Sequence, residues 1–337
     1  MTLVSVIIPC YNEQSRIGNL LNALKDQTYP QEQIEILIAD GLSTDNTRGE
    51  IAGFKWSHPS MKIEVVDNPT HSIPAGLNLA LRASHGEVMV RLDAHSRPYP
   101  DYIEKCVEAI NQGLAENVGG IWEIQPGSDT WLAQSIARAA AMPIAVGDAL
   151  YRHASKPAYV ETVPFGAFKR EMLAHIGFYN ETLLTNEDYE FNARILASGG
   201  RIWLDPRIRS QYFARASISD LARQYARYGF WKWKMLQGNP ASLRWRQLLP
   251  PLFILSLLVL LVIALIYRSL WFIPIALLGI YLLVLMAFSL GAAVQTKKLF
   301  YLVGIPMAIA TMHVSWGLGF LWSMINRTRF RSMGLRH

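Results

Sequence analysis

The segment Glu87–His95 has the sequence EVMVRLDAH and decides which fold the chain is expected to adopt. Its largely apolar run, Glu87–Leu92, is typical of a buried strand. Asp93 and His95 lie where that strand is expected to stop, two residues apart. Asp offers a hard oxygen ligand and His a borderline nitrogen ligand, so the pair suits Mn²⁺ or Mg²⁺ better than a closed structural zinc site. The alternative is an ordinary strand-end turn containing Asp93, and the surrounding sequence has to separate the two.

Short apolar runs alternate with helical patterns on both sides of this segment. The expected strands are Val4–Ile8, Ile34–Ala39, Lys62–Val66, Glu87–Leu92 and Val118–Ile121. The expected helices are Gln14–Lys25, Thr44–Ala52 with Thr44 as N-cap, and Ile73–Ala83 with Pro74 in its first turn. This alternation predicts an α/β fold with a mainly parallel sheet flanked by helices. Ligands of such sheets bind at the carboxyl ends of the strands, where the polar clusters of this chain also fall.

The pattern is less regular after residue 121. Short strands are expected near Tyr159–Val163 and Arg201–Leu204, and helices near Lys169–Ile176 and Glu187–Ala197. The last of these helices starts in Thr185-Asn186-Glu187-Asp188-Tyr189-Glu190, where three carboxylates gather. They are explained either by the favourable interaction of acids with a helix N-terminus or by a carboxylate general base in a cleft.

Polar clusters also follow the first two strands. In Pro9-Cys10-Tyr11-Asn12-Glu13, the last two residues are expected to start a helix, whose electropositive N-terminus favours an anion. Ordinary helix capping by Asn12 and Glu13 is the alternative, and for this segment taken alone it is the favoured interpretation. In Asp40–Thr47, the glycine permits a tight turn, and Asp40 is placed to accept hydrogen bonds from a base or a ribose. A turn with a capping box is the alternative there.

Charge is distributed very unevenly along the 337 residues. All 26 acidic residues lie at or before Asp220, and with 19 Lys and Arg that part carries a formal charge of −7. The 117 residues after Asp220 contain no acid and 13 Lys and Arg. A basic, acid-free stretch rich in Trp and Leu indicates contact with a membrane. Nucleic-acid binding is not expected, because long apolar runs interrupt the basic residues.

The two cysteines and the N-terminus indicate the compartment of the first part of the chain. Cys10 and Cys106 are far apart and show no CxxC spacing, which fits a reducing compartment. The N-terminus opens directly into an expected strand, without the basic and apolar regions of a signal peptide. The first part of the chain is therefore expected in the cytosol.

The last third of the chain has the pattern of a membrane segment. Ser217-Ile218-Ser219-Asp220 resembles a capping box opening the basic, aromatic helix Leu221–Leu236, which is expected to lie in the membrane interface. Within that helix, Gln224, Arg227 and Tyr228 share one face, where they could contact either a substrate or lipid headgroups. Three apolar stretches follow at about 248–267, 270–294 and 299–325, each long enough to cross a bilayer at roughly 20 residues per span.

The orientation of these stretches raises a conflict. With the N-terminus inside, three spans place Lys297 and Lys298 inside but the basic tail 327–337, with Arg327, Arg329, Arg331 and Arg336, outside. That arrangement opposes the positive-inside rule. The sequence leaves two explanations open: the third segment re-enters or lies in the interface, or the rule does not hold for this chain.

The order of these motifs resembles that of the family 2 glycosyltransferases, whose fold is the nucleotide-diphospho-sugar transferase (GT-A) fold. The matching stretches, over about residues 3–200, are VSVIIPCYNE, IADGLSTDNT, GLNLALRASHGE, VRLDAHSRPYPDYI, FGAFKRE and TNEDYEF. The Asp-Ala-His variant, the stretch from Ser72 to Asn78, and a short membrane tail with His313-Val314-Ser315-Trp316-Gly317 resemble the succinoglycan-type exopolysaccharide glucosyltransferases. The resemblance implies a cytosolic GT-A catalytic domain over 1–216, an interfacial helix over 217–247 and transmembrane segments over 248–326.

The resemblance also implies roles for individual residues. The residues expected to bind the nucleotide are Pro9, Tyr11, Glu13, Asp40, Arg91 and Asp93, with Asp40 as the uracil contact. Asp93 matches the first Asp of the family's DxD element, and His95 stands where the second Asp usually stands, so both are expected metal ligands. Asp188 matches the catalytic base. Glu187 and the QxxRW-like set Gln224, Arg227 and Tyr228, with Tyr in place of Trp, are expected to contact the acceptor or the diphosphate.

The implied activity is that of an inverting, metal-dependent hexosyltransferase using Mn²⁺ or Mg²⁺. It would transfer a sugar, with glucose favoured, from a UDP-sugar to a lipid-linked saccharide in bacterial exopolysaccharide or cell-surface glycan synthesis. The implied location is the inner membrane, multi-pass, with anionic lipids as partners and the catalytic domain in the cytoplasm. A polyprenyl-phosphate sugar transferase and a non-catalytic membrane subunit are the alternatives. The sequence predicts no oligomeric state.

Overall fold

The structure, a computed structural model, describes residues 1–147 and 149–326. Within them the chain forms two compact units, one of residues 1–123 and 149–212 and the other of residues 124–147 and 213–326. The expected domain bounds stay a prediction; in the structure, residues 124–147 group with the second unit. They do so because their helix α5 (Trp131–Ala140) packs closely on the last helix of the chain, where a Cβ at Gly304 would meet the Ser135 side chain.

The first unit is built around a mixed β-sheet with the strand order β3-β2-β1-β4-β8-β6-β9-β5, and β7 pairs with β9. Its strands are β1 (Val4–Cys10), β2 (Ile34–Asp40), β3 (Lys62–Asp67), β4 (Val88–Arg91), β5 (Arg97–Pro98), β6 (Asn117–Gln125), β7 (Ala158–Tyr159), β8 (Ala167–Lys169) and β9 (Ile202–Phe213). The first four strands pair in parallel, as expected, whereas β8 pairs antiparallel with β4 and β6. The parallel half carries the strand ends predicted to bind a ligand.

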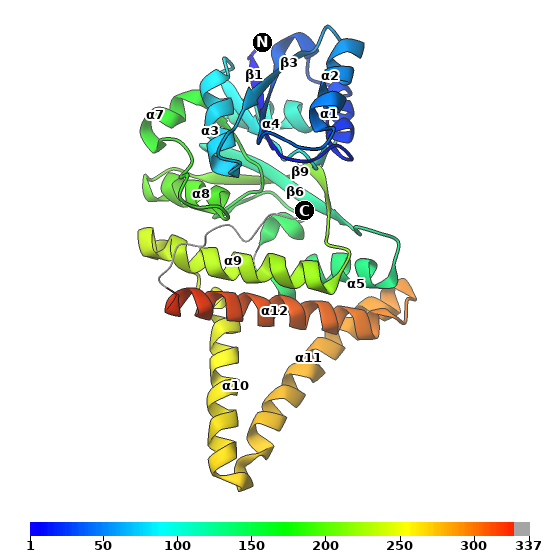
Figure 1. The fold of residues 1–337 in the computed structure, drawn as a ribbon, viewed down its shortest axis with the longest axis vertical. Helices are drawn as coiled ribbons and strands as arrows, with labels where there is room; N and C mark the ends of the chain where they lie inside the picture. Colours follow the sequence, from blue (N-terminus) through cyan, green and yellow to red (C-terminus); the bar gives the residue numbers. More distant parts are fainter. Residues whose placement is uncertain (148, 327–337) are drawn as a thin grey trace. The chain divides into compact units, whose positions relative to one another are not determined.

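Helices cover both faces of this sheet (Figure 1). On one face, α1 (Ile17–Lys25), α2 (Thr47–Ser57) and α4 (Tyr102–Asn111) bury apolar side chains in a core that they share with the strands. On the other face, α3 (Ile73–Ala83) and α8 (Glu187–Ala197) do the same. Alternate residues of one strand enter different cores: Ile8 lies in the first and Ile7 in the second. Burial on both faces is why these strands are continuous apolar runs.

Several expected elements have different bounds. The helix expected from Thr44 begins at Thr47, with Asn46 as its N-cap residue. The helix expected over Lys169–Ile176 divides into the end of β8, the 3₁₀ turn η3 (Arg170–Met172) and the single turn α7 (Leu173–Ile176). Strand β9 is much longer than the four residues expected, because it pairs with both β5 and β7.

The second unit is helical. Besides α5 it contains α6 (Pro143–Val146), α9 (Ile218–Gly238), α10 (Leu249–Ile266), α11 (Phe272–Thr296) and α12 (Tyr301–Ile325). The expected cap of α9 is confirmed, because the Ser217 hydroxyl accepts a hydrogen bond from the Asp220 amide at 3.1 Å. Three helical segments are long and apolar enough to cross a membrane: Trp245–Ile266, Arg268–Thr296 and Tyr301–Ile325. Figure 1 shows α9 and α12 side by side, whereas α10 and α11 form a hairpin leading away from them.

Candidate active site

The loop after β1 is fastened to the loop after β2. Asn12 adopts a positive φ of 52°, and its amide donates to the Ser43 hydroxyl at 2.8 Å. The Glu13 amide donates to the Thr47 hydroxyl at 2.7 Å. Helix α1 begins only at Ile17, so neither Asn12 nor Glu13 starts or caps that helix, and the expectation that they do is wrong. Their polar groups instead join two neighbouring strand ends into one surface.

Asp40 is the last residue of β2, and its side chain is fully buried. Its carboxylate accepts hydrogen bonds from the Ser43 amide at 3.1 Å and from Arg48 Nε at 2.6 Å. Arg48 also pairs with Asp67, at the end of β3. Because these donors already hold the Asp40 carboxylate, its expected contact with uracil stays a prediction.

Tyr11 meets a residue that the sequence did not single out. Its ring and the ring of His71 lie edge to face with centroids 5.5 Å apart. His71 has a positive φ of 58°, and its Nδ1 lies within hydrogen-bonding distance of the Gly41 carbonyl. A non-glycine residue held in this backbone region points to a constrained site. The only available sequence signal was its place just after the third strand and before Pro74.

A second cluster of charges lies at the end of β4. The buried Arg91 side chain donates from Nη2 to Glu187 at 2.8 Å and to Asp93 at 3.2 Å. Glu187 is the first residue of α8, so this ion pair joins segments 96 residues apart. Asp188 follows it and interacts electrostatically with Arg91 and Asp93. The structure therefore brings together four of the predicted site residues.

The Arg91 side chain is buried, whereas a side chain that contacts a nucleotide directly would be expected to reach an open surface. Its side chain is only 4% exposed, and the Tyr179 ring lies 5.9 Å from the guanidinium. Its Nε and Nη1 are buried and have no hydrogen-bond partner among the described residues. Two donors thus remain for a bound group, and nucleotide binding by Arg91 stays a prediction.

The carboxylates beside Arg91 favour their protonated forms more than ordinary acids do. Burial raises the pKa of Asp188, and the negative charge of Asp93 raises it further, although Arg91 and a hydrogen bond from the Tyr189 amide oppose the shift. Burial likewise raises the pKa of Glu187 against the opposing charge of Arg91. A carboxylate with a raised pKa is a stronger base than an exposed one, as general-base catalysis requires.

Asp93 and His95 form a donor set that fits a divalent cation. His95 Nδ1 lies 3.1 Å from Glu13 Oε1, and this carboxylate–imidazole contact directs the other ring nitrogen away from Glu13. Burial alone would lower the pKa of His95, but the hydrogen bond to Glu13 and the charge of Asp93 raise it. In residues 1–147 and 149–326, no group of three His, Cys, Asp or Glu side chains is arranged to hold a metal. Two protein ligands completed by phosphate oxygens and water are typical of Mg²⁺ and Mn²⁺ sites at substrate phosphates.

The QxxRW-like set lies in the second unit, on α9. Gln224 Nε2 donates to the Tyr228 hydroxyl at 2.9 Å, which confirms that these two residues share a face. Their expected contact with the acceptor or diphosphate, and that of Arg227, stays a prediction.

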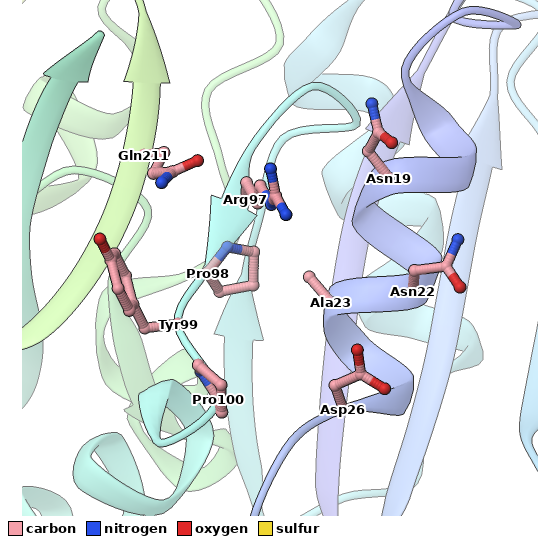
Figure 2. A pocket seen from close by; sticks show the side chains of 9 residues that line it. All are labelled: Asn19, Asn22, Ala23, Asp26, Arg97, Pro98, Tyr99, Pro100 and Gln211. Atoms are coloured by element: carbon pink, nitrogen blue, oxygen red, sulfur yellow. The ribbon is translucent and has the colours of Figure 1, made fainter.

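An open pocket in the first unit lies apart from these residues. It is lined by Asn19, Asn22, Ala23, Asp26, Arg97, Pro98, Tyr99, Pro100 and Gln211. Figure 2 shows α1 on one side and the β5 segment with Gln211 on the other. None of the residues that line this pocket belongs to the predicted site.

Comparison with known proteins identifies the fold and the family. The sequence profile of Glycosyl transferase family 2 matches residues 5–177, slightly more than half of the chain. The chain belongs to this family. The GT-A prediction is confirmed by the solved structure of a mannosyltransferase from Pyrobaculum calidifontis in complex with GDP-Man and Mn²⁺. The two structures superpose with a TM-score of 0.62 at 19% identity, covering 95% of this chain and 87% of the other.

Two curated relatives of this glycosyltransferase belong to glycan assembly. The dolichyl N-acetyl-α-D-glucosaminyl phosphate 3-β-D-2,3-diacetamido-2,3-dideoxy-β-D-glucuronosyltransferase of Methanococcus voltae is 25% identical over 331 residues, which cover 96% of this chain and 98% of the relative. The succinoglycan biosynthesis protein ExoA of Rhizobium meliloti is 29% identical over 247 residues, which cover 73% of each chain. The similarity to the first relative therefore extends over both the first unit and the helical second unit of this chain.

Proposed function

We propose that this glycosyltransferase is an inverting hexosyltransferase that moves a sugar, with glucose as the first candidate, from a UDP-sugar to a lipid-linked saccharide. The observation that carries the proposal is the cluster at the end of β4, where the proposed base Asp188 and Asp93 lie near the buried Arg91. The name of the Methanococcus voltae relative, which acts on a dolichyl-phosphate sugar, supports a lipid-linked saccharide as acceptor. ExoA supports exopolysaccharide synthesis.

In the proposed reaction, Asp188 takes the proton of an acceptor hydroxyl. The hydroxyl oxygen attacks the anomeric carbon from the face opposite the diphosphate, and the bond to the diphosphate oxygen breaks with its electron pair leaving on UDP. An α-linked donor thus gives a β-glycoside. Arg91 keeps Glu187 and Asp93 in place through its ion pairs. When bound, Mn²⁺ or Mg²⁺ held by Asp93 and His95 would offset the charge that grows on the leaving diphosphate.

The donor is proposed to be held by the joined β1 and β2 loops. Pro9 and Asp40 lie at the ends of β1 and β2, and Tyr11 and Glu13 lie in the loop after β1. The Tyr11–His71 ring pair adds an aromatic edge beside them. Ring faces and carboxylate acceptors are the groups that recognise a nucleobase and a ribose. We place the enzyme in the inner membrane with its catalytic unit in the cytoplasm, because α9 is basic and aromatic and its capping acid is the last acid of the chain.

The deciding experiment incubates the purified full chain with radiolabelled nucleotide sugars and membrane lipid extract, with and without Mn²⁺. The proposal expects label to pass from UDP-glucose, in the presence of metal, into a lipid product longer by one sugar. Label found as a lipid-linked sugar phosphate would instead support a polyprenyl-phosphate sugar transferase. No transfer from any nucleotide sugar, together with no hydrolysis, would support a non-catalytic subunit.

A further inference from the structure

Helix α12 packs lengthwise against α9 instead of extending beside α10 and α11. A Cβ at Gly229 of α9 would lie 2.1 Å from the Trp316 carbonyl oxygen, and one at Gly319 of α12 would lie 2.1 Å from that of Ala226. Further along, Lys234 Nζ donates to the Asn326 carbonyl at 3.3 Å. The two helices therefore run in the same direction in backbone contact (Figure 1). Small residues are what permits such a close approach.

The partner helix α9 is too polar to cross a bilayer. Its 21 residues contain five charged side chains, which are Asp220, Arg223, Arg227, Lys232 and Lys234. Each charged side chain at the centre of a bilayer adds an unfavourable insertion free energy. If α12 crossed the membrane in its observed packing, α9 would have to be drawn across with it. The charges of α9 therefore argue that α12 stays at the surface.

Helix α12 itself differs from α10 and α11 in the way expected of a surface helix. Its mean hydropathy is 1.3 against 2.9 and 2.5, and 44% of its most apolar segment is buried against 17% in each of the others. His313 Nε2 lies 3.1 Å from the Ile144 carbonyl of α6, which ties the middle of α12 to the helices beside it. The remaining face is apolar and exposed, with Val303, Met307, Leu318 and Trp322 at helical spacing. One apolar stripe on a packed helix suits the boundary between headgroups and acyl chains.

Both ends of the α10–α11 hairpin meet this same helical layer. Near the start of α10, the Pro250 carbonyl oxygen would lie 2.8 Å from a Cβ at Gly317 of α12. At the end of α11, Gln295 accepts from Arg138 of α5 at 2.8 Å, and Lys298 donates to Gln134 at 2.7 Å. The chain therefore leaves the layer through α10 and returns to it through α11.

We propose that only α10 and α11 cross the membrane, and that α9 and α12 lie together in the plane of its cytoplasmic surface against anionic headgroups. The chain then has an even number of crossings, so the arginines after residue 326 follow α12 on the side of Lys297 and Lys298. This removes the conflict with the positive-inside rule that three spans create. The inference rests on the membrane location in the proposed function but on nothing about the reaction, so its test uses no activity readout.

Three variants of the full chain, each with one added cysteine, separate the two topologies in cells. Ser269→Cys lies in the turn between α10 and α11, Asn326→Cys directly follows α12, and Gln237→Cys, exposed at the end of α9, is the matched control. Each is treated with a membrane-impermeant maleimide before and after permeabilisation. The unaltered chain gives the background, since Cys10 and Cys106 are buried.

The proposal expects Ser269→Cys to react in intact cells, and Asn326→Cys and Gln237→Cys to react only after permeabilisation. Labelling of both Ser269→Cys and Asn326→Cys in intact cells, with Gln237→Cys protected, would show that α12 crosses and would overturn the inference. Protection of all three in intact cells would overturn it as well, because the hairpin would then not cross. The reverse of the expected pattern would keep two crossings but place α9 and α12 on the outer surface, and it would overturn the inference together with the proposed cytoplasmic location of the catalytic unit.

Discussion

Two groups of carboxylates in the catalytic unit are held in opposite ways. In the loop cluster, formed by Asp40, Asp45 and Asp67 with Arg48, acids are bonded by amides, hydroxyls and a half-exposed arginine. In the buried cluster, formed by Asp93, Glu187 and Asp188 around Arg91, three acids share one buried cation. Each cluster has three acids and one arginine, so the difference lies in the exposure of the arginine, 44% for Arg48 and 4% for Arg91, and in the supply of hydrogen-bond donors.

This difference sets the protonation behaviour of each cluster. Burial raises the pKa of Asp45, but bonds from the Thr47 hydroxyl and amide and from the Gln14 amide together outweigh it and lower that pKa. In the buried cluster, burial outweighs the other effects and raises the pKa of Glu187 and Asp188. A carboxylate with many donors stays ionised and serves as a fixed support, whereas one with few donors is ready to accept a proton. We therefore propose a supporting role for the first cluster and proton transfer for the second.

The largest effect is expected from Asp188→Asn, which removes the proton acceptor and keeps the shape of the side chain. Turnover should fall by about 10²–10⁴-fold, the usual contribution of a general base. UDP affinity, measured by calorimetry, should stay unchanged because the loop cluster is untouched. Asp45→Asn is the matched change in the loop cluster and should retain most of its turnover. If Asp188→Asn kept most of its activity, the division of roles between the clusters would be wrong.

The next effect concerns stability and compares the two arginines. Arg91→Met leaves Asp93 and Glu187 without their buried cation and should reduce the free energy of unfolding by about 3–5 kcal/mol, as for a broken buried ion pair. Arg48→Met removes a cation that is 44% exposed, and the Ser43 donors to Asp40 remain, so its cost should be clearly smaller. Urea unfolding of both variants measures the difference. Equal losses would mean that exposure does not distinguish the clusters.

The pH dependence of the reaction provides a third test. Because the pKa of Asp188 is raised, kcat/KM should fall as the pH drops through that pKa, by about tenfold per pH unit below it. UDP binding measured without metal should persist to lower pH, since the pKa of Asp45 is lowered. The two clusters change the free energy of unfolding in opposite directions as the pH falls. Glu187 and Asp188, whose pKa values are raised, stabilise the folded state at low pH, whereas the stabilisation by Asp45 is lost as the pH falls through its folded pKa. Parallel loss of binding and turnover with falling pH would contradict the comparison.

The smallest effect is expected from His95→Asp, which restores the usual DxD element. A second carboxylate should strengthen binding of Mg²⁺ relative to Mn²⁺ by a few-fold, because oxygen ligands suit the harder ion. The measurement is UDP affinity as a function of each metal, compared with Glu13→Gln, which alters the group holding His95 without supplying a second carboxylate ligand. An unchanged metal preference would show that His95 is not a ligand.

Much of the catalytic unit could be predicted from local patterns. The parallel strands β1 to β4 and the order of the motifs can be predicted from short apolar runs and the turn residues between them. This is possible because each strand buries its own apolar residues in a shared core. Asp93, Glu187 and Asp188 were found in this way. Arg48 and His71 were not, because their partners Asp40 and Tyr11 lie on other strand ends and no local signal links them.

Sequence by itself determined which segments were strands, which residues offered carboxylates and imidazole at their ends, and which helices were long and apolar enough to enter a membrane. Tertiary structure decided how those capacities are used. It pairs Arg91 with Glu187, which is 96 residues away in the sequence. It starts α1 at Ile17, so that Asn12 and Glu13 do not cap this helix. It also placed α12 against the charged α9, while α10 and α11 stay largely uncovered. The physical reason is that composition sets the cost of exposing a segment to water or lipid, whereas only the packed neighbours determine which of the two it meets.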